Sequence, residues 1–131
     1  MSVEFELSEI FPATPEALYA AWLDPEQHSA MTGGVAETSA EDGASFTAWD
    51  GYIQGRNLEL NPPSRIIQTW RTVEFTESDP DSLLEIRFEP VEEGTRLTIH
   101  HSELPAHGTI YEQGWIDSYF VPMREYFQNE P

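Results

Sequence analysis

The sequence predicts an α+β fold in which an antiparallel sheet of about six strands packs against a long C-terminal helix. Three observations support this prediction. Residues 3–11 alternate between apolar and polar side chains, as a strand with one wet face does. Segments rich in β-branched and aromatic residues follow between 44 and 103, separated by short turn-forming stretches. Residues 109–127 carry apolar side chains at spacings of three and four, which is typical of a helix.

Start and stop signals predict two short helices after the first strand. Thr14–Glu16 combines a capping residue, a proline tolerated in the first turn and an acid at the positive helix end. Asp24–Glu26 repeats this start signal, and Met31–Gly34 ends the second helix. The side chains expected to be buried in the first helix are Leu18, Tyr19 and Trp22.

The later strands are expected at residues 44–49, 52–60, 65–75, 83–88 and 95–103, with 35–38 as a further candidate. The short gaps between them can join only antiparallel neighbours, so the sheet is a meander. Gly51 is expected to supply the positive φ of a tight turn after Asp50. Gly55 lies inside a strand, where it marks a bulge or leaves room for a neighbouring aromatic ring.

The C-terminal helix has two apolar rows, so we expect it to be enclosed on much of its circumference. The rows contain Trp115, Tyr119, Met123 and Tyr126, and Ile116, Phe120 and Phe127. Pro122 should bend this helix because it removes one backbone donor and crowds the carbonyl of Ser118.

Charge is the strongest compositional signal. The chain contains 24 acidic residues against six basic ones, all six of them arginine, for a formal net charge of −18. This field repels nucleic acid and anionic lipid, so neither is expected as a partner. It also destabilises the compact state unless salt screens it. Adaptation to a salty cytoplasm and an arginine-favouring, GC-rich genome both explain the composition.

Length and composition predict one domain over residues 1–131 and a cytoplasmic location. The acidic, alternating N-terminus Met1–Glu6 is unlike a secretory or transit leader. No window approaches the roughly 18 apolar residues of a membrane span. The chain has no cysteine, which excludes disulfides and thiolate metal sites.

Three stretches resemble the START-like (SRPBCC) superfamily, and within it the group related to the activator of heat-shock protein 90 ATPase. They are TPEALYAAWLDPEQHSAMTGG (14–34), FTAWDGYIQGRNLELNPPSRIIQTWR (46–71) and GWIDSYFVPMREYF (114–127). The resemblance implies the helix-grip fold, in which a curved sheet wraps the C-terminal helix and leaves a cavity between them. It also implies a link with the stress response. Proteins with this fold have many different functions, so the fold by itself identifies none of them.

Few residues suggest catalysis or metal binding. His101, Glu103 and His107 could in principle form a three-ligand zinc site, but their spacing matches no recognised motif. The chain has no cysteine nucleophile, no Gly-x-Ser-x-Gly elbow and no phosphate-binding glycine loop. The sequence therefore predicts no catalytic residues, no metal and no cofactor, and a protein that is not an enzyme.

The aromatic residues suggest a ligand cavity between sheet and helix, although plain core packing is the commoner explanation for any one tryptophan. The candidate lining residues are Trp22, Trp49, Trp70, Trp115, Tyr119 and Met123, with Gln54, Arg56 and His101 as polar anchors. A bulge at Gly55 would turn Arg56 inward, where it would need an anionic partner such as Glu59, Glu85 or a ligand carboxylate. Without the bulge, Arg56 is a solvated surface cation.

The expected function is the binding of a small hydrophobic or amphipathic molecule in this cavity. The main alternative is an interaction domain that contacts a chaperone or another protein, since the acidic surface suits a basic partner patch. A third alternative, implied by the resemblance, is an enzyme acting on an aromatic or polyketide-like substrate.

Overall fold

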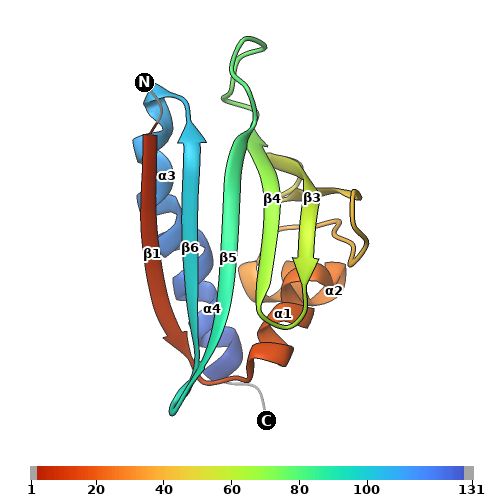
Figure 1. Ribbon diagram of the computed structural model, residues 1–131, viewed down its shortest axis with the longest axis vertical. Helices are drawn as coiled ribbons and strands as arrows, with labels where there is room; N and C mark the ends of the chain where they lie inside the picture. The colour runs from red at the N-terminus through yellow and green to blue at the C-terminus, as the bar shows by residue number, and fades with distance from the viewer. Residues whose placement is uncertain (1–2, 129–131) are drawn as a thin grey trace.

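The computed structural model describes residues 3–128, and the expectations for Met1 and Ser2 lie outside them. Within these residues the chain forms one six-stranded antiparallel sheet, two short helices between the first and second strands, and a long C-terminal helix (Figure 1). The strands are β1 Val3–Phe11, β2 Ser45–Ala48, β3 Ile53–Asn61, β4 Arg65–Thr72, β5 Ser82–Val91 and β6 Gly94–Leu104. The first two helices are α1 Pro15–Leu23 and α2 Pro25–Thr32.

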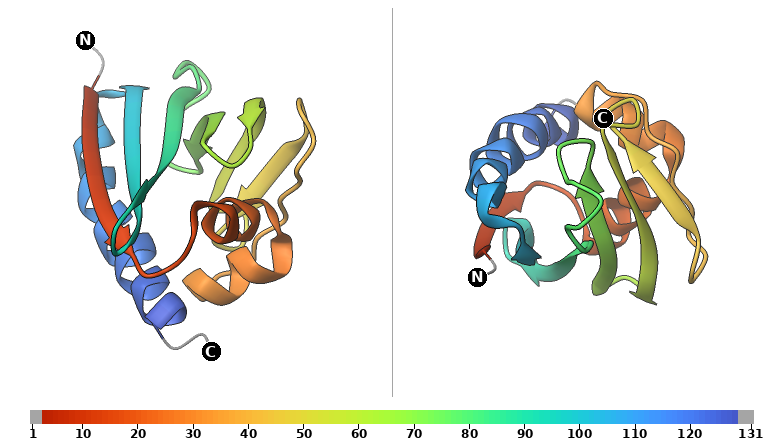
Figure 2. Two further views of the ribbon diagram at one scale, coloured as in Figure 1. Left: turned by 60° about the horizontal axis from the view of Figure 1, so that its bottom comes forward. Right: turned by 90° about the horizontal axis from the view of Figure 1, so that it is seen from above.

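The sheet has the strand order β1-β6-β5-β4-β3-β2 and curls around the C-terminal helix. Figure 2 shows this curvature from above, with the helix on the concave side of the sheet. The predicted meander is therefore confirmed for β2 to β6, and β1 joins its far edge beside β6. Residues 35–38 form no strand; Glu37 instead makes an isolated bridge with Thr47 of β2.

The helix end signals act as predicted. The Thr14 side chain accepts a hydrogen bond from the Ala17 N–H at 3.1 Å, and the Asp24 side chain accepts one from the Glu26 N–H at 3.3 Å. Gly33 ends α2 in the left-handed conformation, with φ of 90°. None of the helices within residues 3–128 is long and apolar enough to cross a membrane.

The C-terminal helix is not uniform along its length. It comprises a 3₁₀ turn at Ala106–Thr109, α3 Ile110–Trp115, a π-helical turn at Ile116–Phe120 and α4 Val121–Gln128. The Val121 N–H bonds to the carbonyl of Ile116, five residues earlier. The irregularity expected from Pro122 thus takes the form of a wide turn immediately before it, which is a common site for such turns.

Gly55 leaves room for an aromatic ring and does not bulge its strand. A Cβ at this position would lie 2.7 Å from Cε2 of Phe46, its cross-strand partner, and 1.9 Å from the Thr69 carbonyl oxygen. The β3 irregularity falls instead between Asn57 and Glu59. The expected bulge at Gly55 is therefore wrong, and the alternative of a neighbouring ring is confirmed.

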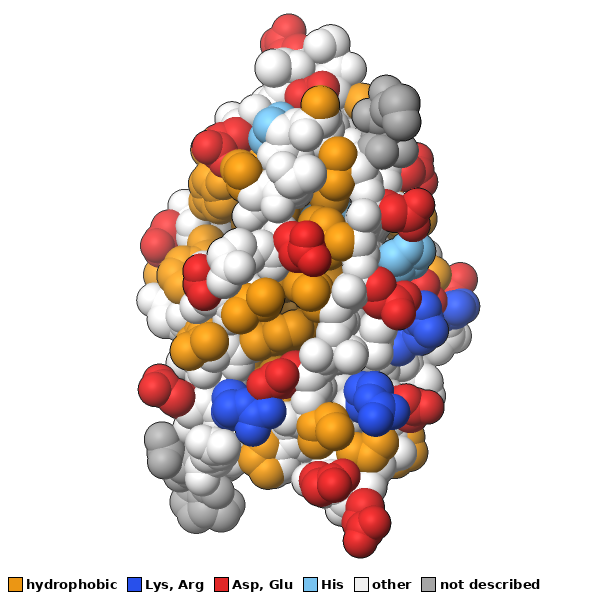
Figure 3. Space-filling view, turned by 90° about the vertical axis from the view of Figure 1, so that its left-hand side faces the viewer, with side chains coloured by type: hydrophobic (Ala, Val, Ile, Leu, Met, Phe, Trp, Pro, Cys, Tyr) orange, Lys and Arg blue, Asp and Glu red, His pale blue; other side chains and the backbone are white. Residues whose placement is uncertain are grey.

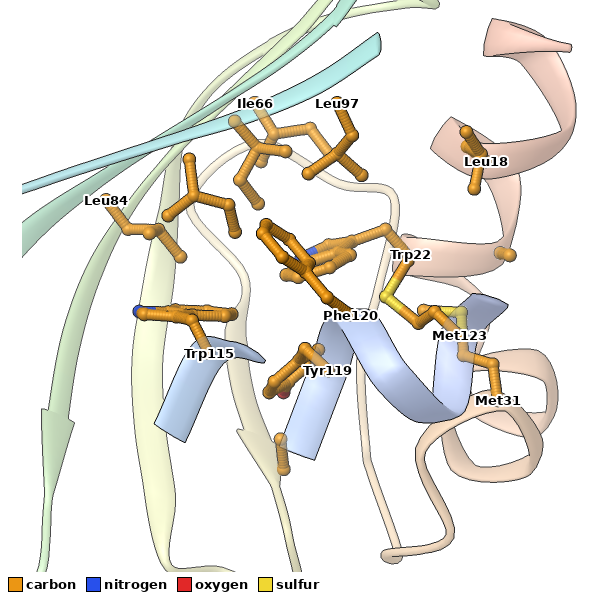
Figure 4. Close-up of a cluster of buried hydrophobic side chains, with 14 of the residues drawn as sticks. Leu18, Trp22, Met31, Ile66, Leu84, Leu97, Trp115, Tyr119, Phe120 and Met123 are labelled. Atoms are coloured by element: carbon orange, nitrogen blue, oxygen red, sulfur yellow. The ribbon is translucent and has the colours of Figure 1, made fainter. Parts of the chain in front are cut away.

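The core lies between the concave face of the sheet, α1 and the C-terminal helix. Figure 4 shows the sheet residues Ile66 and Leu97 facing Trp22 from α1 and Phe120 from the last helix. Leu84, also from the sheet, lies over Trp115. These side chains are all buried. The predicted burial of Leu18, Tyr19 and Trp22 is confirmed.

Candidate functional site

An apolar cavity of about 290 Å³ lies between the C-terminal helix and the β2–β4 side of the sheet. Its lining residues are Trp49, Tyr52, Ile53, Trp70, Tyr111, Gly114, Trp115, Ser118 and Tyr119. None of these nine side chains carries a charge, and six of them are aromatic. Small-molecule binding sites in proteins have volumes from about 300 Å³ upward, so this cavity is close to the smallest of them.

The cavity exists because one strip of the helix carries small residues. Gly114 and Ser118 are one turn apart, so they lie on the same face of the helix, in the row next to that of Trp115 and Tyr119. A Cβ built on Gly114 would meet nothing within 4 Å. The space therefore comes from missing side chains, and it opens along this strip.

Trp49 holds its place in the cavity wall in a sparsely populated backbone conformation. Its φ is 51° and that of Asp50 is 60°, both in the left-handed region that bulky residues avoid. The Asp50 N–H bonds to the Val35 carbonyl at 2.9 Å. Gly34 packs so tightly against the indole that a Cβ there would lie 2.5 Å from Trp49 Cε3. The turn after β2 and the segment after α2 together orient this ring.

A directed chain of hydrogen bonds fixes Trp115. Its indole N–H donates to Nδ1 of His101 at 3.0 Å, so Nε2 of His101 carries the proton and donates to Ser82 Oγ at 2.8 Å. The Ser82 hydroxyl in turn donates to the Trp70 carbonyl at 2.6 Å. Burial, with a smaller contribution from the charge of His100, lowers the pKa of His101 to about 3. His101 is therefore neutral in the folded protein.

A second buried histidine fixes the next ring on the helix. His28 Nδ1 donates to the Trp22 carbonyl at 2.8 Å, which leaves Nε2 to accept from the Tyr119 hydroxyl at 3.0 Å. Burial lowers the pKa of His28 and raises the pKa of Tyr119, so both groups stay neutral. Two neutral histidines thus hold two consecutive rings of the cavity wall.

Hydroxyl groups and one carboxylate form the polar end of the site. Tyr52 donates a short hydrogen bond to Glu74 Oε1, and Tyr111 donates to the same oxygen at 3.5 Å. Thr72 Oγ1 lies 2.6 Å from the Tyr111 hydroxyl, and His107 Nε2 lies 3.3 Å from it. Burial, together with the hydrogen bond to Glu74, raises the pKa of Tyr52. Both tyrosines remain protonated donors at neutral pH.

The structure brings together four of the residues expected to line a cavity, namely Trp49, Trp70, Trp115 and Tyr119. Trp22 lies behind them, stacked on Tyr119 with ring centroids 5.2 Å apart. Met123 is fully buried in the core and does not line the cavity. His101 does not line the cavity itself; it bonds to Trp115 and packs against Trp70, with ring centroids 4.5 Å apart, and both of these rings do.

Two of the expected polar anchors are placed elsewhere. Gln54 and Arg56 are exposed on the convex face, because Ile53 and Asn57 take the inward positions of β3. The Arg56 guanidinium donates to the Gly43 carbonyl at 3.2 Å. The expectation that Gln54 and Arg56 reach the cavity is therefore wrong.

The candidate zinc ligands do not assemble. Both ring nitrogens of His101 already have protein partners, as described above. Within residues 3–128, no group of three or more histidine or acidic side chains is arranged to hold a metal ion.

Sequence reasoning missed the lining residues Tyr52, Ile53, Tyr111, Gly114 and Ser118. A usable signal was present for two of them. Glycine inside a helix is unfavourable, so Gly114 followed four residues later by Ser118 indicates a gap in packing on one helix face.

Curated relatives match this chain as part of longer proteins. Activator of 90 kDa heat shock protein ATPase homolog 2 of Mus musculus is 30% identical over 104 residues, which cover 79% of this chain and 31% of the relative. The corresponding homolog of Dictyostelium discoideum is 35% identical over 66 residues, 50% of this chain and 17% of that protein. The chain spans less than a third of the length of these relatives.

Two solved structures with at least 25% identity match this chain over nearly their full length. An HSP90 activator from Plasmodium falciparum has a TM-score of 0.82 at 25% identity, covering 90% of this chain and 91% of that one. A Chromobacterium violaceum protein has a TM-score of 0.77 at 26% identity, covering 97% and 99%. The family model described as Activator of Hsp90 ATPase homolog 1-like protein matches residues 12–128. The chain therefore belongs to this family and has its START-like, helix-grip fold.

Proposed function

We propose that this protein binds a small hydrophobic or amphipathic molecule in the cavity between the sheet and the C-terminal helix. The observation that carries the proposal is the pairing of Gly114 and Ser118 with a wall of fixed aromatic rings. A helix that served only to pack the core would carry larger side chains on this strip, because protein interiors are close-packed. The cavity is instead kept open between side chains whose orientations are set by hydrogen bonds.

The test uses a substitution on the C-terminal helix whose new side chain would fill the cavity. Gly114→Leu places a side chain into open space, whereas Gln113→Leu adds the same side chain at the neighbouring exposed position. Binding of fatty acids, flavonoids, sterols and aromatic alcohols is measured by tryptophan fluorescence. We expect at least one class to bind the native protein and the Gln113→Leu variant. Gly114→Leu should lower that affinity at least about tenfold, a loss of about 1.4 kcal/mol. If no compound of the panel changes the tryptophan fluorescence of the native protein, the proposal is wrong.

A second candidate function is contact with a chaperone, which we base on the relatives named as Hsp90 activators. A groove beside the free edge of β1, here called the β1 groove, provides a surface for it. Figure 3 shows apolar side chains gathered on this face, with charged side chains between and around them. The groove is lined by Leu7, Ser8, Glu9, Ile116, Phe120, Val121, Arg124, Glu125 and Gln128. The net charge of −18 suits an apolar segment of a partner that also carries basic residues.

This second candidate has its own test. Val121 lines the β1 groove with 52% of its surface exposed, and Ile110 lies outside the groove on the same helix with 54% exposed. If the protein stimulates the ATPase of an Hsp90 through this groove, Val121→Glu should abolish stimulation and Ile110→Glu should not. Equal effects of the two variants, or no stimulation by the native protein, would contradict the candidate.

A further inference from the structure

We infer that the cavity selects ligands with a positively charged head group, such as an aryl-alkyl ammonium ion, over neutral and anionic ligands of the same shape. This inference rests on the proposed function, since it specifies the chemistry of the molecule that the same cavity would bind. It arises from the placement of Glu74 beside a cavity wall that consists largely of aromatic rings.

Glu74 is an acidic group that lies just outside the cavity lining. Its Oε1 accepts hydrogen bonds from the hydroxyls of Tyr52 and Tyr111, and both tyrosines line the cavity. The carboxylate is therefore one hydrogen bond away from the cavity wall. Glu74 is exposed, which leaves its second oxygen accessible to a ligand group that extends past Tyr52.

The aromatic residues of the cavity wall also favour a positively charged ligand group. Aromatic faces carry negative electrostatic potential, and a cation within about 6 Å of a ring centroid is stabilised by it. Trp49, Trp70 and Trp115 come from three different elements and surround the space, with Tyr111 packed against Trp70 at 5.0 Å between ring centroids. Rings on several sides of an uncharged cavity are the arrangement that proteins use for ammonium groups.

An anionic head group finds no positively charged partner among the lining residues, none of which is basic. Arg71 lies nearby over the ring of Phe75, 5.3 Å from its centroid, but it already pairs with Asp81 at 2.8 Å. A ligand carboxylate would also approach Glu74 and enter the field of a chain whose net charge is −18.

The test uses three probes with one skeleton: 3-phenylpropylamine, which is cationic at neutral pH, 3-phenylpropan-1-ol and 3-phenylpropanoate. Affinities are measured by tryptophan fluorescence and calorimetry at fixed ionic strength. We expect the amine to bind about tenfold more tightly than the carboxylate, with the alcohol between them. Glu74→Gln keeps an acceptor for both tyrosines but removes the charge. It should weaken amine binding about threefold to fivefold, the range of a partly exposed ion pair, and leave alcohol binding unchanged.

Glu77→Gln is the matched control, because it removes the same charge from an exposed position of the same loop. An equal loss of amine affinity in both variants would assign the preference to the overall charge and overturn the role of Glu74. Alcohol binding without any preference for the amine over the carboxylate would overturn the inference and leave the proposed function intact. If none of the three probes binds and the wider ligand panel also fails, the proposed function falls and the inference falls with it.

Discussion

Trp115 donates its indole N–H to His101, and this single hydrogen bond links the protonation of a buried histidine to the wall of the cavity. The acceptor, Nδ1, must be unprotonated for the bond to exist. Protonation of His101 would place an uncompensated charge beside Trp70 and Phe5, whose rings pack against it.

The first prediction concerns stability at acidic pH. The pKa of His101 falls from 6.5 in the unfolded chain to about 3 in the fold, so the unfolded state takes up a proton first. Stability should therefore be lost as the pH drops through the window between these two values. Between about pH 7.5 and pH 5 the loss from His101 amounts to about 2 kcal/mol. The pKa of His28 is also lowered and acts in the same direction.

The measurement is urea denaturation of the native protein and of His101→Gln at both pH values. The carboxylates contribute equally to the pH dependence of stability in the two proteins. The difference between the two pH dependences therefore reports the contribution of His101. A variant that loses as much stability as the native protein over this range would show that His101 is not the titrating group.

The second prediction contrasts two glycines of the C-terminal segment. Gly114→Ala should stabilise the protein by about 0.5–1 kcal/mol, because the new methyl group meets open space and restricts the unfolded chain. Gly108→Ala should destabilise it, since the Cβ would lie 2.6 Å from Cβ of Leu104. Thermal and chemical denaturation of both variants test the contrast. Destabilisation by Gly114→Ala would mean that the cavity is filled at this point.

The third prediction concerns the contact between Gly34 and Trp49. Gly34→Ala should displace the indole, because the added methyl group would overlap its ring atoms. We expect a loss of about 1–3 kcal/mol, the usual range for overpacking, and a changed tryptophan emission spectrum. Trp49→Phe in the same background should recover part of the lost stability, since the smaller ring removes the overlap. Independent, additive effects of the two substitutions would argue against the contact.

The fourth prediction concerns salt. Arg65, Arg71, Arg87, Arg96 and Arg124 each lie within ion-pair distance of a carboxylate. Acidic residues far outnumber these arginines, and most of the acidic residues between positions 3 and 128 belong to none of these pairs. Their mutual repulsion is screened by salt, so the melting temperature should rise from low to molar potassium chloride. A flat curve would favour genome composition over salt adaptation as the origin of the charge.

The sequence predicted the fold well because each element carries its own local signals. Caps, turn glycines and periodic apolar residues act within a few positions, and the helices and strands begin and end near the expected residues. Trp49, Trp70, Trp115 and Tyr119 could be assigned to the cavity because large aromatic residues on several elements converge on the same layer.

The polar anchors could not be predicted because the face of a strand residue depends on where a bulge falls. A bulge at Gly55 would have turned Arg56 inward. The irregularity comes after Asn57, so Arg56 keeps the alternation and points outward. Glu74 was missed for a related reason: its contact with Tyr52 joins residues 22 positions apart, and no local pattern encodes that contact.

Because of the wide turn at Ile116–Phe120, the last helix contains one residue more than a regular α-helix would need to join the same end points. Deletion of one residue from this turn would restore regular α-helical geometry. The side chains of Trp115 and Met123 would still point to the same side of the helix as they do now. Loss of one residue from α4 would instead rotate Phe127 by about 100° away from Phe11. One-residue gaps between relatives in this helix should therefore accumulate at the wide turn.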